Sequence, residues 1–464
     1  PAPAPSPAPS PAPAPSPAPS PAPAPSPSVP VPPPPPPQLP PRPSTAPTPG
    51  PALRWLGTNW LPNTDAAGKV LISDFEQLPL NRWVHAQTNR LDDIVPRPRY
   101  PTFLGQPDGS PSIVNAWCGA AWDYVDQKMF VSGGGHADSH FCENGVYALE
   151  ADTMAFSTIV GRSPSSAAQY WDASRGVFVA GMQGVGGRAP LADGTAPASH
   201  TYDSLVWIPS NIVGNRRGAI LMFAHTVGII DLDTGSYDTP YYNGDSPVDL
   251  SYKICVSDGW NVLHARANFH YRHWDLRPTT RTPTIWNSNS RGAFAGSFSS
   301  GTNIVYDNKM MVRMPQRREF VVLSGGINAR CRMGQGFDSG DRTGWGRFHD
   351  AITITSSDGS HLMFNDSANW RDRSVATHFF AAGGTYDHWG NCIWVQSNVA
   401  GGGLFRLTGL DGNTWTSERV AGAEALSTSG NGTYHRCQLF VKGMARCLMR
   451  VSSTTGYPEV CRVA

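Results

Sequence analysis

The sequence predicts an all-β fold, a β-propeller, which follows a disordered proline-rich segment. Three observations lead to this prediction. Composition changes sharply near Pro51, strands and turns follow a set order between Asn115 and Phe156, and that order returns several times further along the chain. Sheets made of such repeated units close into a ring, which leaves few exposed strand edges.

Residues 1–52 form the predicted spacer, and residues 53–464 form the predicted propeller. The spacer consists of PAPAPS repeats, the proline run Pro32–Pro37 and an end rich in Ser, Thr and Pro. It has no apolar periodicity, so we expect no packed core there. Such chains favour extended polyproline II, at about 3 Å per residue. We expect a passive linker; the alternative is a ligand for a proline-binding domain.

The segment from Asn115 to Phe156 reads as one blade of a propeller. An apolar run ends at Trp122, and a turn leads to a strand at 128–132 and then to three glycines. A further strand at 145–149, another turn and the aromatic Phe156 follow. This order of glycine triplet, Val-Tyr strand and late aromatic is typical of a kelch-type blade.

The same pattern of an aromatic residue, an aspartate and a β-rich run recurs along the chain. It appears at Trp122-Asp123, Trp171-Asp172, Tyr306-Asp307 and Tyr386-Asp387. The aspartate can accept backbone N–H bonds in a tight turn, which explains its place between strands. The first two copies are about fifty residues apart, the size of a kelch blade. We expect about seven blades, with six or eight as alternatives.

Ring closure is expected to involve both ends of the propeller. The last segment, residues 432–463, predicts a strand (RCQLFV), a turn at Lys442-Gly443, a strand (RCLMRVSS) and a final strand (PEVCRV). The first segment after the spacer, Leu53 to Leu61, is predicted to pair with this last blade. Such pairing would remove unpaired sheet edges.

Charge and composition exclude several classes of function. The net charge is +1 and the charged residues are interspersed, so neither a nucleic-acid-binding stripe nor an acidic tail is predicted. The sequence contains no run of about twenty apolar residues, so no membrane span is predicted. The sequence begins inside the repeats without a signal peptide, and we interpret it as a processed or trimmed product.

The eight cysteines, together with the proline-rich spacer, favour an oxidising compartment. We therefore expect a secreted protein, at an extracellular or periplasmic surface. No CxxC pair is present, which argues against a zinc knuckle or a thioredoxin-like motif.

Several motifs resemble a group of bacterial secreted kelch-like proteins, also called galactose-oxidase-like propellers, whose activities are mostly unassigned. The motifs are PNTDAAG, VNAWCGAAWD, VSGGGHAD, NGVYALEADT, ASHTYDSLVWIP and NGTYHRCQLFV, and the similarity covers most of residues 55–463. The chain departs from that group at Cys118 and Cys142, where Ser, Asn or Gly is commoner, and at Cys437 and Cys447, which look like additions. The resemblance implies the fold and leaves the activity open.

A candidate catalytic set consists of His200, Tyr202 and Arg217, from ASHTYDSLVW and NRRGAI. A His or Tyr base with an Arg to neutralise a carboxylate could carry out β-elimination on a uronate sugar, and certain propeller polysaccharide lyases are similar. The alternative is an ordinary blade turn. A copper-radical oxidase is less favoured, because no cysteine lies in a recognisable version of its Tyr–Cys motif.

A candidate metal site consists of Cys255, His264, His270 and His273. Cysteine and histidine are the usual ligands of zinc. Residues three apart on a strand lie on opposite faces, so His270 and His273 would need a loop or bulge to meet at one ion. We predict no essential cofactor, with a structural zinc as the alternative.

The loop GGGHADSHFC offers a second cluster. His136, His140 and a Cys142 thiolate could hold zinc, with Asp138 nearby. Alternatively, the polar side chains bond the loop and Cys142 forms a disulfide with Cys118. The two interpretations exclude each other, because an oxidised cysteine is not a thiolate ligand.

A disulfide is also predicted between Cys437 and Cys447, across the last hairpin. With a turn centred on Lys442-Gly443 the two residues are nearly opposite, where Cβ atoms are about 4.5–5.5 Å apart. Cys461 on the final strand is the competing partner. A slip of one residue would turn one sulfur to the other face.

The predicted function is binding of a glycan or cell-surface polymer without catalysis, by a propeller tethered through its spacer. Aromatic planes stack on sugar C–H faces, and Arg and Asn bond hydroxyls or carboxylates. The alternatives are the uronate lyase and a structural module of an extracellular or virion-like assembly. The loop tryptophans considered for sugar stacking are Trp274, Trp286, Trp345, Trp370 and Trp389.

Overall fold

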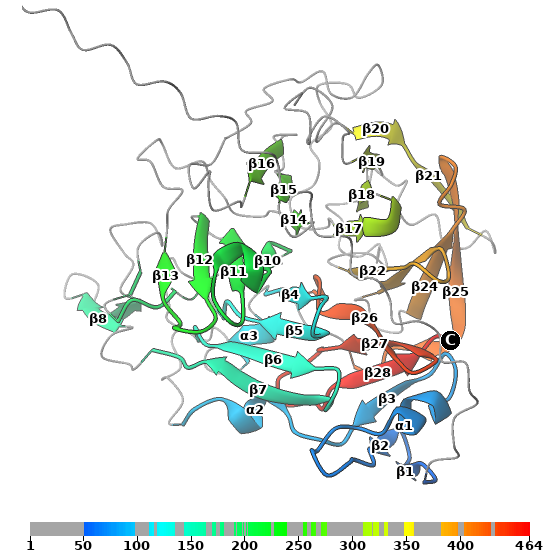
Figure 1. Ribbon diagram of the computed structural model, residues 1–464, viewed down its shortest axis with the longest axis horizontal. Coiled ribbons are helices and arrows are strands. Elements are labelled where there is room, and N and C mark those ends of the chain that lie inside the picture. The colour runs from blue at the N-terminus through cyan, green and yellow to red at the C-terminus, as the bar shows by residue number, and fades with distance from the viewer. Residues whose placement is uncertain are drawn as a thin grey trace, which may run out of the picture. The chain divides into compact units, whose positions relative to one another are not determined.

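The computed structural model of the protein consists mainly of β-strands joined by turns (Figure 1). It describes residues 51–97, 111–115, 118–134, 143–163, 169–172, 177–180, 190–191, 193–196, 198, 201, 203–223, 227–238, 254–257, 261–265, 271–275, 310–317, 319–323, 329–332, 348–356, 382–397, 403–427 and 432–464. The predicted spacer, residues 1–52, lies almost wholly outside these ranges.

The helices in the described ranges are all short. They are α1 (Ile72–Gln77), α2 (Leu91–Ile94), α3 (Ser112–Asn115), α5 (Ser210–Val213) and the 3-10 turn η2 (Pro315–Arg317). None of these helices has the length and apolar character needed to cross a bilayer. The described secondary structure therefore agrees with the predicted all-β class.

The described strands form seven sheets. Three are antiparallel and follow the chain from strand to neighbouring strand. They are β4 (Ala120–Asp123), β5 (Lys128–Val131), β6 (Val146–Glu150) and β7 (Ala155–Val160); β10 (Leu205–Ile208), β11 (Ala219–Phe223), β12 (Val227–Asp231) and β13 (Tyr237–Asp238); and β17 (Met310–Met314), β18 (Glu319–Leu323), β19 (Ala329–Arg332) and β20 (Phe348–Ala351).

Three further sheets are less regular. Two are short, β8 (Gln169–Asp172) with β9 (Val177–Ala180), and β14 (Ile254–Ser257), β15 (Asn261–Ala265) and β16 (Tyr271–Asp275). The third contains β22 (Gly383–Asp387), β23 (Cys392–Gln396), β24 (Gly403–Thr408) and β25 (Thr414–Glu424), and β21 (Thr353–Ser356) is added parallel to β25.

The closing sheet joins the two ends of the described chain. Its order is β1 (Arg54–Leu56), β2 (Asn59–Leu61), β3 (Trp83–Ala86), β28 (Glu459–Arg462), β27 (Ala445–Arg450) and β26 (Cys437–Lys442). Figure 1 shows the blue β3 beside the red β28, to which it is antiparallel. The first segment joins the sheet of the last blade, as predicted, but not by direct pairing: Leu53 to Leu61 contributes β1 and β2, β2 pairs with β3, and β3 is the strand that pairs with β28.

Two of the four predicted aromatic-Asp turns, at Asp123 and Asp387, are described with their hydrogen bonds and form as predicted. The Asp123 carboxylate accepts the backbone N–H groups of Val125 and Asp126, at 2.8 and 3.0 Å. Asp387 accepts the N–H of Gly390 at 3.0 Å. These bonds satisfy donors that a two-strand turn would otherwise leave without partners.

Apolar cores fill the interfaces on both sides of the β4–β7 sheet. One core joins this sheet to the closing sheet and includes Tyr147 and Phe440, both buried. Another joins it to the β10–β13 sheet and includes Phe130 and Trp207. The β4–β7 sheet therefore lies between the closing sheet and the β10–β13 sheet.

The remaining interfaces complete the series. Strand β10 contacts β14, and β14 contacts β17. A core with Val321 and Phe405 joins the β17–β20 sheet to the β21–β25 sheet, and one with Trp394 and Cys461 joins the latter to the closing sheet. Six of the seven described sheets, all except β8–β9, thus follow one another in a closed circuit, which is the arrangement of a β-propeller.

The predicted register of the final hairpin is wrong. Lys442 pairs with Ala445, so the turn is Gly443-Met444, one residue later than expected. Cys437 pairs with Arg450 and Cys447 with Phe440, three positions out of register. Gly443 has φ 59°, which suits the first position of a type II′ turn and explains the shift.

Cys437, Cys447 and Cys461 are buried free thiols in the structure, and Cys118 is also buried. The cysteine pairs predicted to form disulfides are therefore not joined where the structure describes both partners. Cys142, the expected partner of Cys118, lies outside the described residues. Cys118 instead accepts the N–H of Gly134 at 3.0 Å.

The buried thiols are expected to resist labelling in the folded protein. Burial raises the pKa of Cys437 to about 12 and also raises the pKa of Cys447, so little thiolate is present near neutral pH. Treatment with a maleimide should modify both residues only after denaturation, as read by mass spectrometry of peptides. A peptide linked through Cys437 and Cys447, or labelling of either residue in the folded protein, would contradict this expectation.

Candidate functional site

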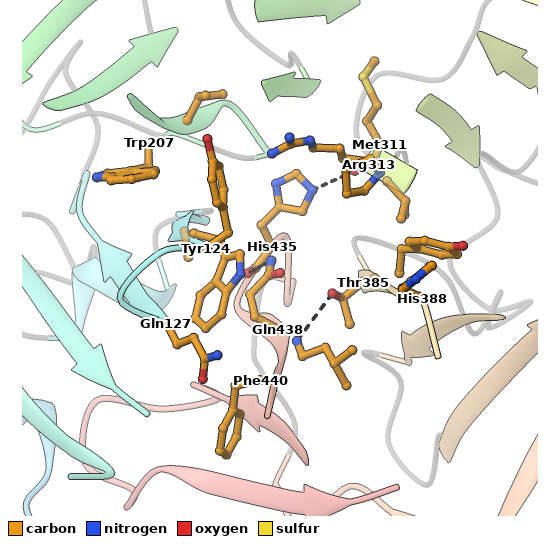
Figure 2. A pocket seen from close by; sticks show the side chains of 18 of the residues that line it. Tyr124, Gln127, Trp207, Met311, Arg313, Thr385, His388, His435, Gln438 and Phe440 are labelled. Atoms are coloured by element: carbon orange, nitrogen blue, oxygen red, sulfur yellow. Dashed lines mark hydrogen bonds between the residues drawn. The ribbon is translucent and has the colours of Figure 1, made fainter. Parts of the chain in front are cut away.

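A pocket of about 220 Å³ lies where five strands from different sheets meet. Its described lining comes from β4, β10, β17, β22 and β26 and from the segments that adjoin them (Figure 2). A single water needs only about 10–15 Å³ of such space, so the pocket has room for a ligand larger than water.

Strand β4 and the turn after it bring three side chains to the pocket. Ala120 and Trp122 of β4 and Tyr124 of the turn line it, while Asp123 is buried beneath the turn. Trp122 packs toward the closing sheet and Tyr124 toward the β10–β13 sheet, so the pocket lies at the end of β4 that faces both neighbours. Burial raises the pKa of Asp123 to about 6, against the lowering effect of its backbone hydrogen bonds.

One wall of the pocket is an aromatic pair capped by a cation. The rings of Tyr124 and Trp207 meet edge to face, with centroids 5.1 Å apart. The Arg313 guanidinium lies 4.8 Å from the centroid of the Tyr124 ring (Figure 2). A guanidinium stacked on a ring keeps its N–H bonds in its own plane, directed past the ring edge.

The opposite wall comes from the end of β22 and its turn. The Tyr386 and His388 rings have centroids 6.4 Å apart, and those of His388 and Trp389 are 6.3 Å apart. The Trp389 side chain is 42% exposed, so an aromatic face is available to a ligand. Burial raises the pKa of Tyr386, which keeps its hydroxyl protonated near neutral pH.

Two glutamine side chains bring buried acceptors to the pocket lining. The Oε1 atoms of Gln127 and Gln316 are buried and have no hydrogen-bond partner among the described residues. Gln127 sits in the β4–β5 turn with φ 54°, a conformation that is uncommon outside glycine. A buried acceptor without a donor costs roughly 1–3 kcal/mol, which a ligand hydroxyl could recover.

His435 lines the pocket and pairs with Asp203, which is not part of the lining. Its Nδ1 is 3.0 Å from the Asp203 carboxylate. Its Nε2 is 2.8 Å from the carbonyl oxygen of Met311 (Figure 2). Both neighbours are acceptors, so both ring nitrogens donate and the ring is an imidazolium. Burial opposes this charge, but attraction to Asp203 prevails and raises the pKa of His435.

The His435–Asp203 pair is therefore suited to holding strands together. Asp203 also accepts the backbone N–H groups of His435 and Met311, at 3.1 and 3.4 Å. These contacts join the segments before β10 and β26 to β17. With both nitrogens engaged, His435 has no lone pair with which to act as a base.

The predicted catalytic set is described only in part. His200 and Tyr202 lie outside the described residues. Arg217 lies in the β10–β11 connection, where its Nε is 3.7 Å from an Asp233 carboxylate oxygen and its Nη1 donates to the Leu232 carbonyl. It does not line the pocket. The set stays a prediction.

The predicted metal residues are also described in part. Cys255 lies opposite His264 on the neighbouring strand. His273 lies opposite Leu263, so His264 and His273 are not opposite each other. His270 lies outside the described residues, as do His136, Asp138, His140 and Cys142 of the other cluster. In the part of the chain that the structure describes, no group of three or more His, Cys, Asp or Glu residues is placed to hold a metal ion.

Sequence reasoning named one pocket aromatic, Trp389, as a candidate for sugar stacking. It treated Trp122 only as part of a turn and passed over Tyr124, Trp207 and Arg313. No alternation pattern identifies the set, because Trp122 packs against the core shared with the closing sheet and Tyr124 against the core shared with the β10–β13 sheet. Trp286, Trp345 and Trp370 lie outside the described residues.

Comparison with known proteins gives only distant likenesses. No family model matches the chain, and no curated protein is significantly similar to it. Among solved structures, PorZ, a bacterial surface component of the type-IX secretion system of Porphyromonas gingivalis, is 10% identical with a TM-score of 0.32, over 74% of this chain and 36% of PorZ. The chain thus spans about a third of PorZ.

Two further structures are similar at the same level. A chain of the mitotic checkpoint complex is 11% identical with a TM-score of 0.38, over 80% of this chain and 98% of that one. TolB from Acinetobacter baumannii is 12% identical with a TM-score of 0.30, over 68% of this chain and 59% of TolB. Likenesses this distant imply no function, and the β-propeller assignment rests on the closed circuit of sheets.

Proposed function

We propose that this propeller binds a carbohydrate in the pocket between β4, β10, β17, β22 and β26, without transforming it. The observation that carries the proposal is the pair of buried amide oxygens on Gln127 and Gln316, which have no described partner and belong to side chains that line the same pocket as several aromatic residues. Sugar hydroxyls donate to such oxygens, and sugar C–H faces pack on aromatic planes.

Two features of the site favour binding over catalysis. The deepest described histidine, His435, has both nitrogens hydrogen-bonded within the protein. The exposed Trp389 at the pocket wall offers a flat contact surface that needs no reacting group. The uronate lyase formed by His200, Tyr202 and Arg217 is the second candidate, and the assay below includes it.

The wider setting is part of the same proposal. We propose a kelch-type propeller of about seven blades, supported by the repeated aromatic-Asp turns. The proline-rich composition of residues 1–52 supports display on a spacer at an extracellular surface, where glycans and cell-surface polymers occur.

Replacing Trp389 with alanine is expected to weaken glycan binding about tenfold, because one stacking plane worth about 1.4 kcal/mol is lost. Gln127→Ala should have a similar effect by removing a hydroxyl acceptor. Affinities can be measured by calorimetry with ligands first selected on a glycan array. Trp55→Ala is the matched control, since Trp55 is 41% exposed but lies on β1, outside the pocket lining.

Two outcomes would contradict the proposal. Equal losses in Trp389→Ala and Trp55→Ala would show that the pocket is not the binding site. A rise in ultraviolet absorbance from unsaturated uronates during incubation, lost in Tyr202→Phe, would show that the protein is a lyase.

A further inference from the structure

We infer that the ion pair between Asp387 and Arg446 positions Trp389 for ligand binding, by fixing the β22–β23 turn against the closing sheet. The inference rests on the proposed function and deepens it, because it adds two residues that act on the ligand only through Trp389. Neither Asp387 nor Arg446 belongs to the described lining of the pocket.

The β22–β23 turn covers residues 388–391, between the paired residues Asp387 and Cys392. His388 and Trp389 of this turn line the pocket. The Trp389 side chain is 42% exposed, so packing covers only part of it. Its direction therefore follows the backbone of the turn, and whatever holds that backbone also sets the aromatic wall of the pocket.

Asp387 holds the turn from inside. Its carboxylate is fully buried and accepts the backbone N–H of Gly390 and the indole N–H of Trp394, each at 3.0 Å. Nη1 of Arg446 donates to both carboxylate oxygens, at 2.8 and 3.0 Å. Hydrogen bonds between charged groups are the stronger kind. One carboxylate thus connects the turn to β27.

Arg446 is a fixed point of attachment, because its backbone is bonded on both sides of β27. On one side it lies opposite Val441 of β26, which lines the pocket. On the other side its N–H donates to the carbonyl oxygen of Ala464, and its own carbonyl accepts the N–H of Val463, both at 2.8 Å. The guanidinium therefore ties the turn of one sheet to the backbone of the next.

Gly390 leaves no spare room between the turn and the ion pair. A Cβ atom at this position would lie 2.9 Å from Oδ2 of Asp387 and 3.0 Å from Nη1 of Arg446. Both distances are shorter than the optimal separation of non-bonded atoms, about 3.5–4.0 Å for carbon. The φ of Gly390 is not in the left-handed region, so the contact with the pair is what requires glycine here.

The test is a double-mutant cycle between Arg446→Gln and Trp389→Ala, read as affinity for the oligosaccharide that binds the wild type on the glycan array. We expect Arg446→Gln alone to weaken binding about three- to tenfold. In the Trp389→Ala background it should have no further effect, because the pair acts through Trp389. Arg446→Lys should keep part of the affinity, since an ammonium can still bond the carboxylate.

A second measurement needs no ligand. In protein labelled with fluorotryptophan, the fluorine NMR resonance of Trp389 can be assigned by its loss in Trp389→Phe. This resonance should shift or broaden in Arg446→Gln and in Gly390→Ala, as the turn leaves its position. The other tryptophan resonances should stay in place, apart from that of Trp394, which bonds Asp387. A general loss of structure would instead change all of them.

The matched control is Arg406→Gln. Arg406 lies in the same sheet as the turn, pairs with the exposed Glu418 and is outside the described lining, so both measurements should stay unchanged. A loss of affinity in Arg446→Gln that persists in Trp389→Ala, or an unmoved Trp389 resonance, would overturn the inference and leave the proposed function standing.

If the unmodified protein binds no oligosaccharide on the array, the proposed function fails and the inference fails with it. If Arg446→Gln does not fold, as judged by its melting curve, Gly390→Ala takes its place in the cycle. This variant removes no charge, and the same non-additivity with Trp389→Ala is expected.

Discussion

Replacing Glu459 with alanine is expected to lower the free energy of unfolding by about 3–5 kcal/mol, because a buried ion pair loses one partner. Both Glu459 and Arg450 are fully buried, and their charged groups are 3.0 Å apart. Glu459 Oε1 also accepts the hydroxyl of Ser452 at 2.9 Å. The pair joins β27 to β28, so the substitution weakens the closing sheet, which contains both ends of the described chain.

The matched control is Glu418→Ala. Glu418 pairs with Arg406 directly across β24 and β25, at 2.7 Å, but the two side chains are 47% and 44% exposed. An exposed pair contributes at most about 1 kcal/mol. Urea unfolding followed by tryptophan fluorescence measures both variants. Losses of equal size would show that burial does not set the strength of the Glu459 pair.

The stability of the protein is expected to fall as pH rises above about 6.5, the usual pKa of histidine in an unfolded chain. Asp203 raises the pKa of His435 in the folded protein despite the opposing effect of burial. The folded state therefore holds this proton more tightly than the unfolded state. The resulting stabilisation is complete below the unfolded pKa and is lost as pH rises through the folded pKa.

Asp203→Asn should remove most of this dependence and lower stability at about pH 6 by roughly 1.5–3 kcal/mol, the value of a hydrogen bond to a charged group. Urea titrations between about pH 6 and 9 measure the slope. Asp411→Asn is the control, because Asp411 pairs with Arg317 at the surface with 80% of its side chain exposed. If the unfolding free energy of Asp203→Asn depends on pH as strongly as that of the wild type, a group other than His435 titrates.

The closing hairpin shows how far sequence reasoning reached and where it stopped. The strands of residues 437–450 were predicted from their apolar character, and the turn was placed within one residue of its position. A type II′ turn has glycine in its first central position. Placing Gly443 in that position predicts the register that the structure shows. When the turn moves by one residue, the partner of each strand residue moves by two positions. Cys437 and Cys447 are therefore no longer nearly opposite.

The candidate site was less accessible to sequence reasoning. The sequence identifies Trp389 as a candidate, but five strands form the pocket. The positions of these strands along the chain do not indicate that they lie close together. His435 lines the pocket, and its partner Asp203 is 232 positions away in the chain. Asp203 lies in ASHTYDSLVWIP and His435 in NGTYHRCQLFV, but neither motif indicates that the two residues meet. Only the meeting of the β10, β17 and β26 segments gives His435 two acceptors.

The sequence by itself determined the all-β class, the aromatic-Asp turns and the pairing of both ends in one sheet. These features depend on neighbours within a few residues, through side-chain alternation, turn chemistry and the need to cover strand edges. The tertiary structure decided the hairpin register, the burial of the Arg450–Glu459 pair and the set of side chains around the pocket. Those depend on contacts between distant segments, whose geometry is fixed only when the sheets pack against one another.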